Sequence, residues 1–295
     1  SPEYVNAHGS GGMYSTPRDL AQFLMAILAG GEGPEGRLIS ADALNAMLTP
    51  QGTNLPLNID NLYVAGLGWD SVANPRLDYA GRVCFKTGNT ALFSAFIEAL
   101  LDQQLAVAFV HTGADGRLSI EGTDYLLRRA VRDKVNGIPI PPDVAPAFAP
   151  LTNAPSVLLD AAEGLYADDS DITLVAATNG TLTLVRNVAT APFVTTGIVF
   201  RTNGWFSSPA SQDHEFRFTN LAGRAVMVCR DIAPDRSFLH HHLGGERIAS
   251  PILSAAWSNR LDRAWPLLDE HADFYGFTMP VIAYRMMLRQ AGACL

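Results

Sequence analysis

The chain has 295 residues, of which 48% are hydrophobic and 17% charged, and its formal net charge is −8. This composition is typical of a globular protein, and a chain of this length buries a core without disulfide bonds. The acidic balance argues against a nucleic-acid-binding protein, which presents a basic surface. Three scattered cysteines exclude a disulfide framework and a cysteine-based zinc site, and no apolar run is long enough to span a membrane.

The first part of the chain carries signals for both helices and strands. Thr16 is a suitable cap before Pro17, and apolar residues then recur at helical spacing until Gly30. Apolar runs bounded by turn residues predict strands further on, two of them joined as an antiparallel hairpin. In chain order we expect a helix that begins at Pro17 and stops at Gly30, and a short helix that follows Ser40 and ends before Pro50. A loop over 51–62, strands over 82–86, 94–101 and 105–111, and a helix over 119–135 come next.

The composition changes after residue 137. Six prolines lie between residues 138 and 155, which predicts an extended linker because proline lacks a backbone donor and favours extended chain. Short strands with turn signals follow, and they predict a small antiparallel barrel or sandwich. The expected strands cover residues 172–176, 182–185, 198–201, 215–218 and 225–230. The pattern becomes helical again after Pro251. We therefore divide the chain into residues 1–137, a linker over 138–155, a β-barrel over 156–250 and a helical segment over 251–295.

The box Lys86-Thr87-Gly88-Asn89-Thr90 directly follows an apolar strand. A Lys-Thr-Gly box on a strand is one of three motifs of the serine β-lactamases and penicillin-binding enzymes. Residues 11–23 (GGMYSTPRDLAQF) and 63–69 (YVAGLGW) lie upstream of it. In this order the three segments resemble the C-terminal part of the catalytic domain of class C β-lactamase-like serine hydrolases, over residues 1–135. Residues 150–248, with the segment EGLY at 163–166, resemble the lipocalin-like barrel often appended to these hydrolases.

The resemblance implies an α+β fold, in which an antiparallel sheet flanked by helices precedes a small lipocalin-like antiparallel β-barrel and a helical tail. It further implies that Lys86, Thr87 and Gly88 are catalytic and that Asn89 and Thr90 bind the substrate or its oxyanion. Lys86 would place positive charge near the acylating centre and help keep a neighbouring base neutral. Thr87 would bind a substrate carboxylate, Gly88 would let the backbone approach closely, and the Asn89 N–H would donate to the oxyanion. The alternative is that Lys86 is an ordinary lysine that protects a strand edge from pairing.

The nucleophile motif of this family, Ser-x-x-Lys, is missing. The chain has two lysines, Lys86 and Lys134, and a valine stands three positions before each. Residues 4–6 match the family's Tyr-x-Asn motif, but they lie almost against Gly11, so we interpret the match as coincidence. We therefore expect the nucleophile outside these residues, in a part that is cleaved, held in a second chain or absent.

The sequence thus predicts part of a bacterial serine hydrolase that acts through a serine acyl-enzyme on a small peptide, amide or ester substrate. The resemblance implies no cofactor and a periplasmic or extracellular location, although the first residues lack the basic start and apolar core of a signal peptide. The protein partners to consider are a second chain with the nucleophile and another copy in a homo-oligomer; no nucleic acid is expected. The alternative function is a non-catalytic binding or partner subunit that kept the fold.

Two polar runs are weaker candidates for metal binding. Imidazole suits transition metals, but in His240-His241-His242 neighbouring side chains on a strand point to opposite faces, and no carboxylate pattern accompanies them. The acidic run over 168–171 lacks the spacing of a calcium loop and indicates a solvated turn. The sequence therefore predicts no metal site.

Overall fold

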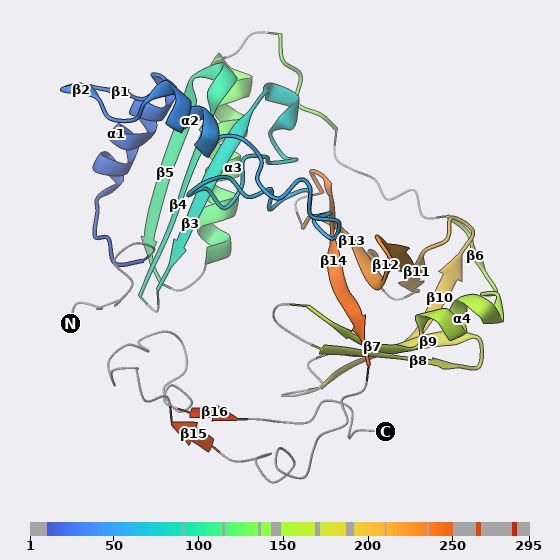
Figure 1. Cartoon of the computed structure of the whole chain (residues 1–295). Coiled ribbons are helices and arrows are strands. Elements are labelled where there is room, and N and C mark those ends of the chain that lie inside the picture. Colours follow the sequence, from blue (N-terminus) through green and yellow to red (C-terminus); the bar gives the residue numbers. More distant parts are fainter. Residues whose placement is uncertain are drawn as a thin grey trace. The chain divides into compact units, whose positions relative to one another are not determined.

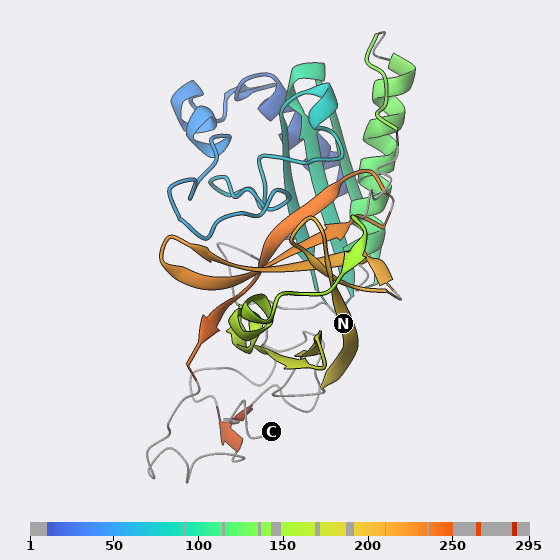
Figure 2. The same cartoon turned by 90° about the vertical axis from the view of Figure 1, so that its right-hand side faces the viewer.

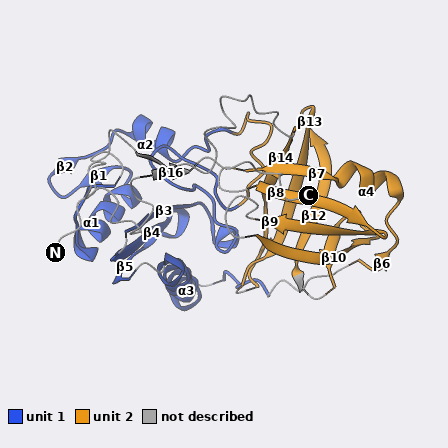
Figure 3. Cartoon of the chain, turned by 90° about the horizontal axis from the view of Figure 1, so that it is seen from below, with its two compact units in different colours: residues 1–52, 62–142, 265–286 blue, residues 53–61, 143–264, 287–295 orange. Residues whose placement is uncertain are grey.

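The computed structural model is shown in Figure 1 and, turned by 90°, in Figure 2. It describes residues 11–90, 92–113, 116–134, 137–142, 149–168, 172–186, 192–209, 211–234, 236–249, 264–266 and 285–287. The chain forms two compact units (Figure 3). Unit 1 comprises residues 1–52, 62–142 and 265–286, and unit 2 comprises residues 53–61, 143–264 and 287–295. Among the described helices, none is long and apolar enough to cross a membrane.

Three antiparallel strands form the main sheet of unit 1, in the order β3 (Val83–Asn89), β4 (Phe93–Leu100) and β5 (Leu105–Thr112). The predicted hairpin is confirmed, with the short 3-10 helix η2 (Leu101–Gln103) and a left-handed Gln104 between β4 and β5. β3 extends three residues beyond the predicted range 82–86, so most of the Lys-Thr-Gly box lies within the strand. Among the described strands β3 pairs only with β4, which makes it an edge of the sheet.

Two helices, α1 (Pro17–Leu28) and α3 (Gly116–Lys134), cover opposite faces of this sheet (Figure 1). Both helices were predicted, and α3 begins three residues before the expected position. Apolar side chains of each helix pack against alternate residues of the strands, as the period of two requires. The α1 face holds Leu24, Ile27, Cys84, Ile97 and Ala99, and the α3 face holds Val83, Leu100, Leu127 and Val131.

The smaller elements of unit 1 are α2 (Ala41–Met47), the short pair β1 (Glu32–Gly33) and β2 (Gly36–Arg37), and the 3-10 helix η1 (Asp78–Ala80). The predicted second helix is confirmed by α2. The Ser40 hydroxyl caps it by accepting a hydrogen bond from the Ala43 N–H at 3.1 Å. Residues 51–62 contain no helix or strand, as predicted.

Eight antiparallel strands close into a barrel in unit 2, because β11 pairs with both β10 and β12. The strands are β7 (Gly164–Ala167), β8 (Ile172–Thr178), β9 (Thr181–Arg186), β10 (Phe193–Arg201), β11 (Phe206–Ser208), β12 (Ser211–Leu221), β13 (Arg224–Ile232) and β14 (Leu239–Ile248). β6 (Leu151–Thr152) adds to β10. Figure 2 shows the curvature of the later strands, drawn in orange. The predicted barrel and its five predicted strands are therefore confirmed.

The barrel interior is apolar. Its core contains Tyr166, Val175, Leu182, Leu184, Ile198, Phe206, Phe216, Met227 and Cys229. The helix α4 (Ser156–Ala162) contributes Leu159 and Ala162 to the same core. The predicted turn at Asn179-Gly180 joins β8 to β9, and both residues have positive φ, 52° and 80°, as a two-residue hairpin requires.

The predicted helical segment over 251–295 is wrong where the structure describes it. Residues there form two short paired strands, β15 (Ala264–Pro266) and β16 (Arg285–Met287). Apolar residues in short runs fit both helical and strand periods, so the pattern alone does not separate the two. The rest of this segment, the Tyr-x-Asn match at residues 4–6 and most of the acidic run at 168–171 lie outside the described residues.

Candidate functional site

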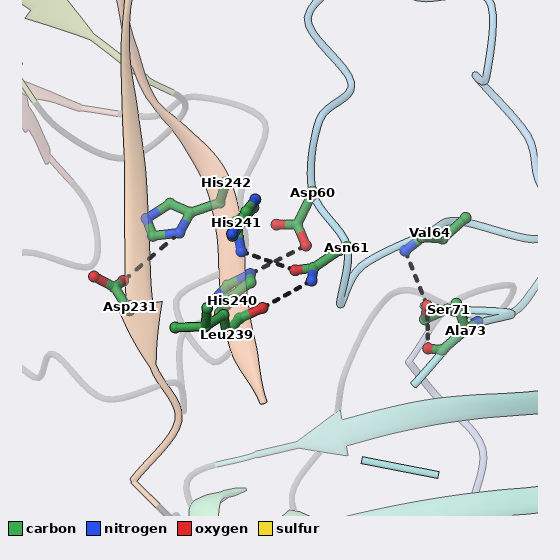
Figure 4. A network of polar contacts seen from close by, with 10 residues as sticks. All are labelled: Asp60, Asn61, Val64, Ser71, Ala73, Asp231, Leu239, His240, His241 and His242. Atoms are coloured by element: carbon green, nitrogen blue, oxygen red, sulfur yellow. Dashed lines mark hydrogen bonds and ion pairs between the residues drawn. The ribbon is translucent and has the colours of Figure 1, made fainter. Parts of the chain in front are cut away.

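The Lys-Thr-Gly box lies at the open edge of β3, where a loop of unit 1 reaches it. Ser71 pairs with Phe85 across this edge, and the two residues exchange backbone hydrogen bonds at 2.9 and 3.3 Å. The buried Ser71 hydroxyl accepts from the Val64 N–H and donates to the Ala73 carbonyl, which fixes the loop (Figure 4). This pairing places the preceding residue, Asp70, beside Thr87.

Asp70 binds two residues of the box at once. Its Oδ1 lies 2.8 Å from the Lys86 Nζ, and its Oδ2 accepts hydrogen bonds from the Thr87 N–H at 2.7 Å and the Thr87 hydroxyl at 2.6 Å. Lys86 also donates to the Thr87 carbonyl at 2.8 Å. The family resemblance implies that the Thr87 hydroxyl binds a substrate carboxylate, whereas here it binds a carboxylate of the chain itself. Asp70 was missed, and the only signal for it was its place directly after the segment 63–69.

Asp70 is held in its charged form. Partial burial raises the pKa of Asp70, but hydrogen bonds from Lys86 and Thr87 more than offset this effect, so its pKa lies below the ordinary value. Asp70 is therefore negatively charged at neutral pH, beside the Lys86 Nζ. Lys86 remains partly exposed, with 40% of its side chain accessible.

The second half of the box faces open space. A Cβ added at Gly88 would meet no atom within 4 Å. The N–H groups of Phe85 and Thr87 point away from β4, and the alternation of an antiparallel ladder places the Asn89 N–H on the same side. The Asn89 side chain lies against Gly116 at the start of α3. The Thr90 hydroxyl accepts from the Leu92 and Phe93 N–H groups and so shapes the turn after β3.

A buried acidic pair, which no sequence motif indicates, lies on the α3 face of the sheet. Glu98 of β4 and Asp124 of α3 are 0% and 3% exposed. The Asn74 amide donates to both carboxylates, at 2.6 and 3.0 Å, and Arg76 lies 3.2 Å from Asp124. Burial and the Asp124 charge raise the pKa of Glu98 well above its ordinary value. Both effects favour the neutral form of the Glu98 carboxyl over the charged form.

Unit 2 contains a second polar cluster, at the end of β13 and β14 (Figure 4). Asp231 is directly opposite His240 in the strand register, and His242 lies on the same face of β14. One donor atom from each of these three residues lies within 4.8 Å of the others. Asp60, from the segment 53–61 that belongs to unit 2, lies 3.1 Å from the His240 Nε2. Burial lowers the pKa of His242, and hydrogen bonding to Asp231 raises the pKa of His214.

Residues 1–131 match the family model described as Beta-lactamase. No curated protein matches the chain. Three similar solved structures are SurE with D-Leu, SurE alone, and the octameric penicillin-binding protein homologue from Pyrococcus abyssi. Their identities to the chain are 19%, 18% and 15%, and their TM-scores are 0.43, 0.40 and 0.32. The matches cover 70%, 70% and 79% of this chain but only 44%, 43% and 46% of those chains, so the present chain spans less than half of their length.

We expect Asp70→Asn to destabilise unit 1 at neutral pH by about 1 kcal/mol, because it weakens charge-assisted hydrogen bonds at a partly exposed site. A group with a lowered pKa contributes its stability above its ordinary pKa, here 3.8, and loses it as the pH falls through the folded-state value. The difference between wild type and variant should therefore shrink below about pH 4. Urea unfolding at pH 7 and pH 3 measures it, and Asp78→Asn serves as a control on the same connection. An undiminished difference at pH 3 would contradict the assignment.

We expect Glu98→Gln to change how stability depends on pH. A carboxyl with a raised pKa stabilises the fold at low pH and costs stability as the pH rises above its ordinary value of 4.5. The amide keeps the acceptor for Asn74 and supplies an N–H to Asp124 without titrating. The variant should therefore gain stability relative to the wild type as the pH rises above about 5, with a slope of up to about 1.4 kcal/mol per pH unit. Exchange protection of the β4 amides in urea is the measurement, and the exposed Glu121→Gln is the control. Parallel pH profiles for wild type and Glu98→Gln would refute the raised pKa of Glu98.

Proposed function

We propose that residues 1–131 supply the Lys-Thr-Gly strand of a serine hydrolase of the class C β-lactamase-like group, and that the barrel of unit 2 is its lipocalin-like appended domain. The reaction is acyl transfer to water through a serine acyl-enzyme, on a small peptide, amide or ester. The serine and its lysine lie outside the 295 residues. The match of residues 1–131 to the Beta-lactamase family model supports a serine hydrolase-like fold. The activity, the substrate and the class C-like subgroup are proposed in addition.

The observation that carries this proposal is the open edge of β3. Lys86 presents a positive charge there, Gly88 leaves room for a substrate, and the Asn89 N–H points outward from the ladder. A substrate carbonyl lying along this edge would place its oxygen near that N–H, where a developing negative charge is stabilised. An ordinary lysine that only protects a strand edge has no need of an empty space beside the next glycine.

In the proposed reaction the external serine oxygen attacks the substrate carbonyl carbon and its proton passes to a neighbouring base. The Asn89 N–H donates to the oxyanion as the carbonyl bond opens. The charge on Lys86 helps keep that base neutral, so that it can accept the proton. The leaving group then departs with a proton, and water hydrolyses the acyl-enzyme in a second, equivalent step.

Asp70 narrows the proposed substrate class. Its carboxylate occupies both donors of Thr87, which is the place the family resemblance assigned to a substrate carboxylate. A second carboxylate at this position would be repelled by Asp70. We therefore favour an ester or amide without a terminal carboxylate next to the reacting group over a peptide that ends in a D-amino acid carboxylate.

The test uses the longest protein that the reading frame of this chain encodes. After treatment with a fluorophosphonate probe, intact mass spectrometry should show one adduct on this protein. The labelled residue should be a serine outside the 295 residues. Lys86→Ala should slow labelling by about 100-fold, in the range for loss of one electrostatic contribution to the transition state. Lys134→Ala is the matched control, because Lys134 is exposed at the end of α3. This variant should be labelled at the wild-type rate. Absent labelling, or equal rates for both variants, would overturn the proposal and favour the non-catalytic binding subunit.

Gly88→Ala separates function from folding in the same assay. The added Cβ meets open space, so the thermal midpoint should stay unchanged or rise slightly, since alanine restricts the unfolded chain more than glycine does. The methyl group should nevertheless obstruct a substrate on the β3 edge and slow labelling by about tenfold or more. A Gly88→Ala protein that is equally stable and equally reactive would show that no substrate approaches this edge.

A further inference from the structure

We propose that Asp231, His240 and His242 bind one divalent first-row transition-metal ion at the end of β13 and β14 in unit 2. Two imidazoles and one carboxylate form a donor set that suits such an ion. The three side chains are partly buried, with accessible fractions between 21% and 28%, so an ion could enter and the ligands are held in place. The three ligands belong to unit 2, whereas the residues of the proposed hydrolase site belong to unit 1.

The strand geometry brings the donors together. His240 and His242 are two positions apart on β14, which places both side chains on one face. Their rings lie 4.6 Å apart, and Asp231 on the neighbouring strand faces them. His241 points to the opposite face, where its ring lies 6.5 Å from that of Trp205. The divergence of consecutive strand residues, which made a metal site in the histidine run unexpected from the sequence, separates His241 from its neighbours. It does not separate His240 from His242.

The contacts within the cluster have the spacing of metal ligands. The Nδ1 of His242 is buried and has no hydrogen-bond partner among the described residues. It lies 3.6 Å from the Asp231 Oδ2, which is too far for a hydrogen bond. Two ligands about 2.1 Å from a tetrahedral ion are about 3.4 Å apart, so an ion between these atoms would satisfy both.

Further carboxylate and imidazole groups hold the ligands from outside. His214 lies with its Nδ1 2.6 Å from the Asp231 Oδ1, which leaves Oδ2 directed at His242. Asp60 lies 3.1 Å from the His240 Nε2 and fixes the orientation of that ring. Such outer partners are a regular feature of metal sites, and their loss typically weakens binding by about 10- to 100-fold. The carboxylates thus come from outside the histidine run: Asp231 lies on the neighbouring strand β13, and Asp60 lies in the segment 53–61.

The test uses the full chain, produced without a polyhistidine tag and freed of metal with EDTA. Titration with Co²⁺ should show saturable visible absorption at one ion per chain, and Zn²⁺ should displace it. His240→Ala and His242→Ala should each weaken Co²⁺ binding by more than about 100-fold, beyond the range for an outer partner. Asp60→Asn should weaken it by about 10- to 100-fold. His241→Ala is the matched control and should bind like the wild type, because its side chain lies on the other face.

Three results would overturn the proposal. The first is that the wild type shows no saturable binding at micromolar Co²⁺. The second is that His241→Ala loses as much Co²⁺ affinity as the ligand variants. The third is that the His240→Ala/His242→Ala double variant still binds Co²⁺. Far-UV circular dichroism checks the fold of each variant. If an alanine variant does not fold, His242→Gln and Asp231→Asn, which keep the side-chain volume, decide in its place. As an independent readout, Zn²⁺ should raise the thermal midpoint of the wild type and of His241→Ala, but not that of His242→Gln.

Discussion

The alternation of neighbouring residues along antiparallel strands is the constraint on which both candidate sites depend. On β3 it directs the N–H groups of Phe85 and Thr87 to the open edge, and that of Asn89 with them. On β14 it places His240 and His242 on one face and removes His241 to the other. A shift of one residue in either register would reverse these orientations, and each site would lose its groups together.

The two polar clusters of unit 1 shift the pKa values of their carboxyl groups in opposite directions. Asp70 lies at the rim of the sheet, where Lys86 and Thr87 donate to it and lower its pKa. Glu98 lies under α3 with a second acid for a neighbour, and burial raises its pKa. The same sheet therefore favours the charged form of a carboxyl at its edge and the neutral form of a carboxyl in its interior. The difference comes from the number of donors and the access of water at each position.

Most elements could be predicted from the sequence because their signals are local. The cap at Thr16, the turn at Asn179-Gly180 and the apolar runs of the sheet and the barrel each involve a few adjacent residues. Asp70 could not be found in this way, since it reaches Thr87 through a loop that pairs with the strand edge. The carboxylate of Asp60 lies 180 residues from His240 in sequence, and no local pattern indicates that distance. The predicted helix after residue 251 failed at β15 and β16 because short apolar runs fit two periods.

The segment 53–61 makes the barrel unit discontinuous in sequence. Asn61 acts as a partner for β14 where β7 does not reach: its amide donates to the Leu239 carbonyl, and its side-chain oxygen accepts from the His241 N–H, both at 2.8 Å. These bonds join residues 178 and 180 positions apart, so they form only after a long loop closes, and contacts of such separation slow folding. A recombinant fragment that begins at residue 143 would lack Asn61 and leave both backbone groups of β14 to water. The barrel unit is therefore compact in structure but is built from separate segments of the sequence. Its folding depends on a stretch of chain that is synthesised well before its first strand.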